Sequence, residues 1–123
     1  MVRTLTVVLT IALTTVAAQA DSSGDAARGA ALFNRCALCH NANKGGGNGL
    51  GPNLFGVVDR KAASLPGFYY SPALKNSNIV WTEDKLRQWL QGPAKMVPGT
   101  RMVFAGVKPQ EADDIAAYLK TRK

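Results

Sequence analysis

The pentapeptide Cys36-Ala37-Leu38-Cys39-His40 constrains this 123-residue chain more than any other feature. It contains both cysteines and the single histidine of the sequence. A four-cysteine cluster and a Cys₂His₂ zinc site are therefore excluded within one chain. The scarcity of these residue types leaves few chemistries open.

Three ordinary explanations of the two thiols fail. A redox dithiol is expected beside a βαβ pattern, which the sequence lacks. A disulfide between Cys36 and Cys39 would close a very short loop and stabilise little. A zinc site lacks a fourth ligand because His40 is the sole histidine. Thiols three positions apart on a helical turn can instead add to both vinyl groups of one haem, with His40 against the iron, so we predict covalent haem attachment.

Three helices are expected in the chain. The first lies within residues 25–36, where small residues accompany Leu32 and Phe33. The second has Thr82 as its N-cap and stops at Gly92-Pro93. The third opens at Pro109, with acidic residues early and basic residues late. The side chains expected to be buried on the second and third helices are Leu86, Trp89, Leu90, Ile115, Tyr118 and Leu119.

Long loops occupy the rest of the chain. Residues 41–56 are glycine-rich, and residues 92–108 are punctuated by Pro93, Pro98 and Gly99. No run alternates clearly enough to predict a strand. Such loops are too long, and the apolar helices too few, for a core made of protein alone. We therefore predict an all-α fold in which the haem supplies the missing interior.

Residues 1–20 have the form of a signal peptide. Arg3 precedes an apolar stretch over residues 5–18, and Ala18-Gln19-Ala20 has the small-x-small pattern of a cleavage site. The stretch is short for a bilayer span, although retention as an anchor is the alternative. We predict cleavage after Ala20, export to a periplasm, and a single domain over residues 21–123.

The net charge is +7, from 15 Lys and Arg against 8 Asp and Glu. A net positive charge of this size is compatible with binding to an acidic protein partner, nucleic acid or anionic lipid. Nucleic acid is not expected as a partner, because no motif combines aromatic and basic residues.

The candidates for the second axial ligand of the iron can be reduced by elimination. With one histidine, two histidine ligands within the chain are impossible. Met1 leaves with the signal peptide, so Met96 and Met102 remain. The Pro98-Gly99 turn favours Met102, but the residues alone leave Met96 open.

A series of short motifs extends over residues 21–123. These motifs are residues 36–40, Gly51-Pro52-Asn53-Leu54, Pro66-Gly67-Phe68, Trp81, and residues 98–106. In order and spacing they resemble class I cytochrome c, especially mitochondrial cytochrome c and the bacterial cytochromes c2. The resemblance implies that fold, a few short helices and long loops around one haem c.

The resemblance also implies roles for individual residues. Cys36 and Cys39 would carry one haem through two thioethers. His40, hydrogen-bonded to the Pro52 carbonyl, and Met102 would be the axial ligands. The residues that match the haem environment are Arg60, Tyr70, Trp81 and Thr100 at the propionates, together with Trp89 and Phe104. Those that match the crossing of the first and last helices are Gly29, Phe33 and Tyr118, and those that match the basic ring are Lys95 and Arg101.

Three positions depart from the family pattern. Trp89 stands where a tyrosine is usual, and its indole N–H can donate but not accept a hydrogen bond. Leu74 and Gly92 stand where asparagines are common. Either plain apolar packing or a change in haem potential is compatible with these departures.

The function implied is electron transfer by a soluble, monomeric carrier rather than an enzyme. Its donor would be a quinol-oxidising cytochrome bc complex, and its acceptor a terminal oxidase or a photosynthetic reaction centre, each met through a basic face. The alternative is a haem peroxidase or gas sensor with an open sixth position. That alternative calls for a distal His or Arg in place of Met102, and the chain has no second histidine.

Overall fold

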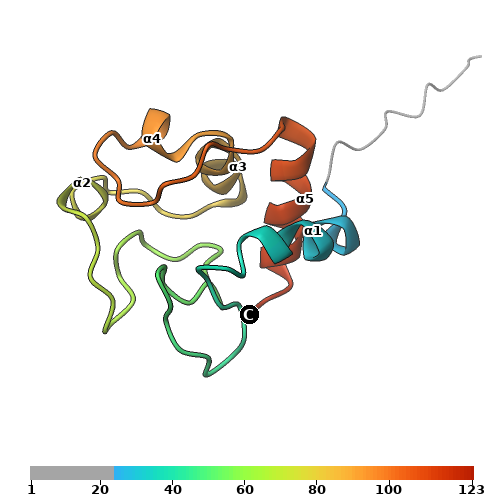
Figure 1. The fold of residues 1–123 in the computed structure, drawn as a ribbon, viewed down its shortest axis with the longest axis horizontal. Coiled ribbons are helices and arrows are strands. Elements are labelled where there is room, and N and C mark those ends of the chain that lie inside the picture. Colours follow the sequence, from blue (N-terminus) through green and yellow to red (C-terminus); the bar gives the residue numbers. More distant parts are fainter. Residues whose placement is uncertain (1–23) are drawn as a thin grey trace, which may run out of the picture.

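The computed structural model describes residues 24–123, which form short α-helices joined by long loops (Figure 1). The helices are α1 (Ala26–Leu32), α2 (Pro72–Lys75), α3 (Glu83–Gln91), α4 (Pro93–Met96) and α5 (Pro109–Lys120), with a 3₁₀ turn, η1 (Phe33–Arg35), after α1. Within the described range the chain forms no strand, only an isolated antiparallel bridge between Lys61 and Val80. The predicted all-α fold is confirmed. The predicted signal peptide, residues 1–20 with cleavage after Ala20, lies outside the described residues.

Side-chain caps start three of the helices. The side chain of Asp25 accepts a hydrogen bond from the Arg28 N–H at the start of α1, at 2.9 Å. Ser71 caps α2 in the same way, and Thr82 caps α3 as the sequence predicts.

Among residues 24–123, no helix has the length and apolar character needed to cross a membrane.

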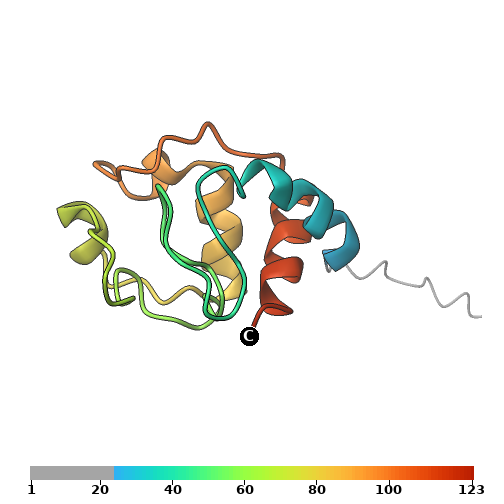
Figure 2. The same ribbon diagram turned by 60° about the horizontal axis from the view of Figure 1, so that its bottom comes forward.

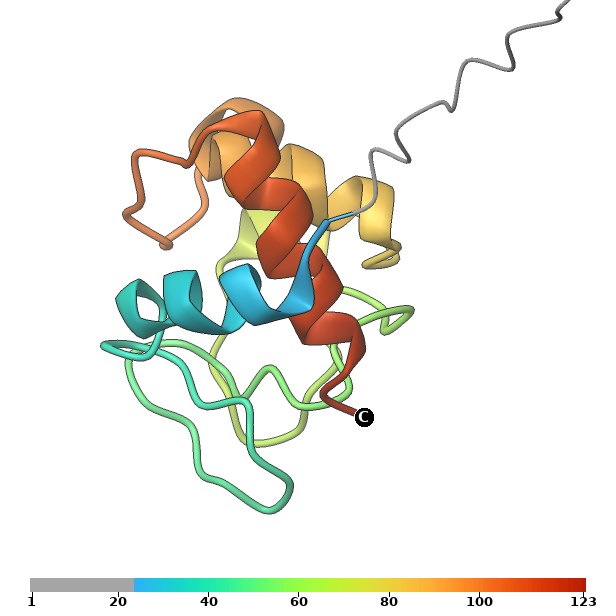
Figure 3. The ribbon, with the colours of Figure 1, turned by 90° about the vertical axis from the view of Figure 1, so that its right-hand side faces the viewer.

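Helices α1 and α5 cross at close range (Figure 3). Gly29 permits this approach, because a Cβ at that position would lie 1.9 Å from the backbone oxygen of Asp114. Beside the crossing, the rings of Phe33 and Tyr118 lie 5.2 Å apart between centroids. Ile115 is buried as expected. The expectation that Tyr118 is buried is wrong, because it is only partly buried. Phe33 packs beside its ring, and the Arg122 guanidinium carbon lies 5.9 Å from the ring centroid.

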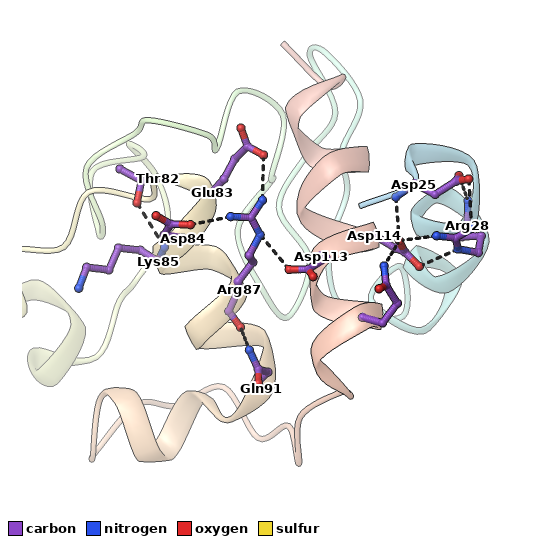
Figure 4. Close-up of polar contacts among 11 residues, drawn as sticks. Asp25, Arg28, Thr82, Glu83, Asp84, Lys85, Arg87, Gln91, Asp113 and Asp114 are labelled. Atoms are coloured by element: carbon purple, nitrogen blue, oxygen red, sulfur yellow. Dashed lines mark hydrogen bonds and ion pairs between the residues drawn. The ribbon is translucent and has the colours of Figure 1, made fainter. Parts of the chain in front are cut away.

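Ion pairs fasten α5 to its neighbours (Figure 4). The buried Asp114 carboxylate accepts from Arg28 Nε at 2.9 Å and from the Asp25 N–H at 2.7 Å. On the opposite side, Arg87 of α3 lies 2.9 Å from an oxygen of Asp113. Helix α5 is therefore held by charges on both flanks.

Helices α3 and α5 lie side by side, and residues 97–108 run from α4 to α5 across one end of the pair (Figure 2). The buried apolar core gathers on these elements and on the loops facing them. Its members are Phe33, Ala42, Val57, Ala62, Trp81, Leu86, Trp89, Leu90, Val97, Ala112, Ile115, Ala116 and Leu119. The predicted inward face of α3, residues 86, 89 and 90, is thus confirmed.

Two short helices fall in segments where the sequence indicates loops. Helix α4 begins at Pro93, the residue expected to end the previous helix. Proline lacks an N–H and has a fixed φ, so it stops α3 and also suits the first position of α4. Helix α2 begins at Pro72 for the same reason. The rule that placed a stop at Gly92-Pro93 is correct, but a new helix starts at the same residues.

Candidate haem-binding site

The cysteines and the histidine lie on one continuous helical turn. The backbone N–H of Cys36 donates to the Phe33 carbonyl at 2.8 Å, and the N–H of His40 donates to the Cys36 carbonyl at 2.9 Å. The turn thus extends the helical path of α1 and η1. Both thiols are unpaired and partly buried. This arrangement places two thiols and an imidazole within one turn, as the sequence predicts for covalent haem attachment.

The thiol of Cys36 is held in its neutral form. Burial raises the pKa of Cys36, the positive charge of Arg35 acts against this rise, and Cys39 adds to it. A low-pKa redox thiolate needs a surrounding that lowers the pKa instead. The site therefore lacks the electrostatic character of a redox dithiol.

His40 has one ring nitrogen committed and one free. Its Nδ1 lies 2.7 Å from the carbonyl oxygen of Pro52. A carbonyl only accepts, so Nδ1 carries the hydrogen and Nε2 keeps its lone pair. Burial lowers the pKa of His40, while the bond to Pro52 acts in the opposite direction. The imidazole is therefore neutral and presents Nε2 as a metal-binding atom.

Gly51 gives the imidazole its space. A Cβ at Gly51 would lie 2.2 Å from Cε1 of His40, far inside van der Waals contact. Since Pro52 is the next residue, one short segment both packs against the ring and accepts its hydrogen bond. The Gly51-Pro52 pair thus fixes the orientation of the imidazole.

Asn53 organises the glycine-rich loop around this segment. The buried side chain of Asn53 donates through Nδ2 to the Asn43 carbonyl at 3.0 Å and accepts from the Phe55 N–H at 2.8 Å. The side chain of Asn48 in turn accepts from the Asn53 N–H at 2.8 Å. Sequence reasoning used Asn53 only as part of a motif and missed this role. The sequence signal that could have indicated it is an asparagine within a glycine-rich run, because such a side chain can satisfy the polar backbone groups of a loop.

Both candidate methionines pack against the core. Met96, the last residue of α4, and Met102, beyond the Pro98-Gly99 turn, are each partly buried there. The N–H of Met102 donates to Oγ1 of Thr100 at 3.2 Å. Thr100 therefore supports the backbone at Met102. Burial alone does not separate the two methionines.

Aromatic side chains gather on the loops and on α3. Trp81 and Trp89 are buried and meet edge to face, with centroids 5.1 Å apart and planes at 64°. Tyr70 is buried and lies edge-on against Phe68 at 4.9 Å. Phe104 is partly buried. Trp89, the departure from the usual tyrosine, is thus packed as an apolar side chain against Trp81.

Arg60 is tied to backbone carbonyls. Its guanidinium donates to the Phe55 carbonyl and to the Asn53 carbonyl, each at 3.1 Å. Burial lowers the pKa of Arg60, and its electrostatic interaction with Tyr70 acts against that shift. Arg60 therefore joins the glycine-rich loop to the loop that carries Tyr70.

The residues present fit a covalently attached haem. Two unpaired thiols on one turn supply the attachment points, and a neutral imidazole with a free Nε2 supplies a ligand atom. Thioether sulfur is available from Met96 or Met102. A haem site needs this donor set and an apolar wall, and Trp81 and Trp89 provide apolar surface.

Known proteins share this combination of fold and motif. The family model described as cytochrome c matches residues 26–123. Cytochrome c of Theileria annulata is 52% identical over 99 residues, covering 79% of this chain and 85% of that protein. Cytochrome c2 of Rhodomicrobium vannielii is 43% identical over 106 residues, covering 85% of each chain. The structure of cytochrome cH from Methylobacterium extorquens is similar with a TM-score of 0.75 and 50% identity, covering 80% of this chain and 99% of that one.

The chain belongs to the cytochrome c family. It binds one covalently attached haem c and transfers electrons. Members of the family act as electron carriers rather than enzymes.

Proposed function

We propose that the chain is an exported carrier of single electrons, processed after Ala20 so that residues 21–123 form the mature protein in a periplasm. Its donor is a quinol-oxidising cytochrome bc complex, and its acceptor is a terminal oxidase or a photosynthetic reaction centre. Support comes from similarity to bacterial proteins named cytochrome c2 and cytochrome cH. The basic net charge of +7 supports acidic partners.

The ligand set of the proposed carrier is His40 and Met102, with Cys36 and Cys39 as the thioether positions. The observation that carries the assignment of His40 is the 2.7 Å contact between its Nδ1 and the Pro52 carbonyl, because this contact leaves the Nε2 lone pair free to bind the iron. Met102 is favoured over Met96 by its place beyond the Pro98-Gly99 turn, where its backbone is held by Thr100.

The bound haem supplies a reversible one-electron couple. The chain's own residues keep that couple in one geometry and away from water. Gly51 and Pro52 fix the His40 ring, while Trp81 and Trp89 exclude water as a buried apolar pair. An apolar surrounding disfavours extra charge and so raises the reduction potential. The proposed roles of Arg60, Tyr70, Thr100 and Phe104 are to hold and shield the haem propionates and edge.

A docking face at the exposed haem edge completes the proposal. Apolar side chains beside two of the proposed haem residues are open to solvent: Leu38, next to Cys39, is 83% exposed, and Val103, next to Met102, is 100% exposed. Arg101 and Lys95 are also exposed nearby in the sequence. Exposed apolar side chains together with exposed basic residues suit brief contact with an acidic face on a membrane redox complex. The carrier acts as a monomer.

The ligand assignment is tested by absorption of the ferric holoprotein. Met102→Ala should remove the methionine–iron charge-transfer band, lower the potential and admit carbon monoxide to the ferrous iron. Met96→Ala is the matched control and should keep the band. Loss of the band in Met96→Ala, with retention in Met102→Ala, overturns the assignment.

The partners are tested by electron transfer from the reduced protein to purified oxidase and to purified reaction centre. Saturable, fast oxidation by one of these complexes supports the proposed route and identifies the acceptor. Slow oxidation by both complexes would remove the proposed acceptors.

A further inference from the structure

Tyr69 lies between two cations on the surface. Tyr69, in the loop just before α2, is 72% exposed. The Arg101 guanidinium carbon lies 4.7 Å from the ring centroid, and Lys75 Nζ lies 5.0 Å from it. Both distances are within the range at which a cation is attracted to an aromatic face. Arg101 is the residue immediately before Met102.

The segment that carries Met102 has few hydrogen bonds to the rest of the protein. In the described part of the chain, residues 98–106 make only short-range ones, from the Thr100 N–H to the Val97 carbonyl and from the Met102 N–H to Thr100 Oγ1. The next anchor is the Val107 N–H, which donates to the Leu90 carbonyl at 2.9 Å. The position of Met102 therefore depends on side-chain contacts made by this segment.

A second contact brings the same two regions together. Gly99 has a φ of 91°, and a Cβ built there would lie 3.2 Å from Cβ of Ala73 in α2. The Pro98-Gly99 turn thus rests against α2, while the Arg101 guanidinium rests against Tyr69 just before α2. These contacts give the Met102 segment two points of support on one neighbouring element.

We propose that Tyr69 is a positioning residue for Met102: its ring holds the Arg101 guanidinium, and this contact keeps the Met102 segment closed over the haem. The proposal rests on Met102 being the axial ligand. It explains why a large aromatic side chain stands exposed at this place, with cations from α2 and from the Met102 segment on it. Opening of the segment must break the Tyr69–Arg101 contact, so the contact favours the closed state.

The test measures imidazole binding to the ferric holoprotein at pH 7. Imidazole can take the sixth position only when Met102 leaves it, so its affinity reports opening of the segment. An exposed cation–π contact stabilises by an amount equivalent to about a two- to fivefold change in an equilibrium constant. Tyr69→Ala and Tyr69→Leu should therefore bind imidazole about two to five times more tightly, and Tyr69→Phe should match wild type.

The leucine variant separates the aromatic contact from simple apolar coverage. If Tyr69→Leu behaves as wild type, or Tyr69→Ala leaves imidazole affinity unchanged, the proposal is overturned. A fall in global stability against urea without a change in imidazole affinity would also overturn it, since that result describes a structural residue only. The methionine–iron band should weaken on warming at a lower temperature in the alanine variant.

Arg101→Gln provides the partner test, with Lys44→Gln as its charge-matched control in the glycine-rich loop. Arg101→Gln should tighten imidazole binding, Lys44→Gln should not, and Tyr69→Ala combined with Arg101→Gln should add little to either change. Fully additive effects would contradict the contact. Met102→Ala separates failure of the ligand assignment from failure of the Tyr69 proposal. If Met102→Ala keeps the methionine–iron band, the ligand assignment itself fails, whatever the Tyr69 variants show.

Discussion

The guanidinium of Arg28 and the carboxylate of Asp114 join the two ends of the described chain, with Nε 2.9 Å from Oδ2 and Nη2 3.2 Å from Oδ1. Asp114 is buried on α5, whereas Arg28 stays largely exposed on α1. The Asp25 N–H and the Gln110 amide also donate to this carboxylate. The α1–α5 crossing is therefore stabilised by a buried carboxylate that accepts hydrogen bonds from Asp25, Arg28 and Gln110.

Asp114→Asn should lower the free energy of unfolding by about 1–3 kcal/mol at pH 7, because hydrogen bonds to a charged acceptor are lost. The bond from Arg28, with the other donors, lowers the pKa of Asp114 to about 2 from 3.8. A depressed carboxyl pKa stabilises the fold above the unfolded pKa and stops doing so as pH falls. The difference between variant and wild type should thus shrink between pH 4 and pH 2, as measured by urea unfolding.

The control for this prediction is Asp84→Asn, which removes an exposed carboxylate from a surface pair with Arg87. That variant should change stability by less than about 1 kcal/mol. If the difference in the free energy of unfolding between wild type and Asp114→Asn stays constant down to pH 2, the role assigned to the charge of Asp114 is contradicted.

Gly29→Ala should destabilise the protein by at least about 1–3 kcal/mol, because the added methyl would overlap the Asp114 backbone oxygen and Tyr118 Cβ. Gly47→Ala is the matched control, since nothing lies within 4 Å of a Cβ there. Thermal unfolding of both holoproteins checks the prediction. Equal midpoints for the two variants would show that the crossing tolerates a wider separation.

Local signals in the sequence predicted the parts of the fold that depend on neighbouring residues. The Thr82 cap and the apolar spacing of Leu86, Trp89 and Leu90 indicated α3, and Pro109 indicated the start of α5. The 36–40 motif correctly predicted that two thiols and an imidazole lie within one helical turn, because its residues are neighbours in the sequence. These features are set by residues only a few positions apart.

Several contacts between distant residues could not be predicted from the sequence, although the resemblance to class I cytochrome c had indicated the helix crossing at Gly29, Phe33 and Tyr118. Arg28 and Asp114 are 86 positions apart, and no pattern along the chain links them. Helices α2 and α4 each span four residues, too few for any periodicity to appear. The contact of Tyr69 with Arg101 depends on how two loops fold back, so only the structure reveals it.

With His40 as the proposed axial ligand, Gly51→Ala should weaken its bond to the haem iron. The added Cβ would lie 2.2 Å from the imidazole, so the ring must move away from the Pro52 carbonyl. Loss of such an outer contact typically costs about 10–100-fold in metal affinity. In guanidinium titrations of the ferric holoprotein, high-spin absorption should appear at a lower denaturant concentration than in wild type. Gly47→Ala, in the same loop, should not shift it; an equal shift would assign the effect to loop stiffness.

Electron transfer to an acidic partner should slow as ionic strength rises. Lys95, Arg101 and Lys108 are exposed, whereas Asp113 of α5 is paired with Arg87. The screening length falls from about 30 Å at 0.01 M to about 8 Å at 0.15 M salt, so steering weakens over this range. Second-order rates measured by stopped flow should fall about tenfold or more. Lys95→Gln should lower the low-salt rate, but Lys120→Gln, which removes a charge paired with Glu83 at 2.7 Å, should leave it unchanged. Equal losses in the two variants would mean that net charge, rather than a basic face, attracts the partner.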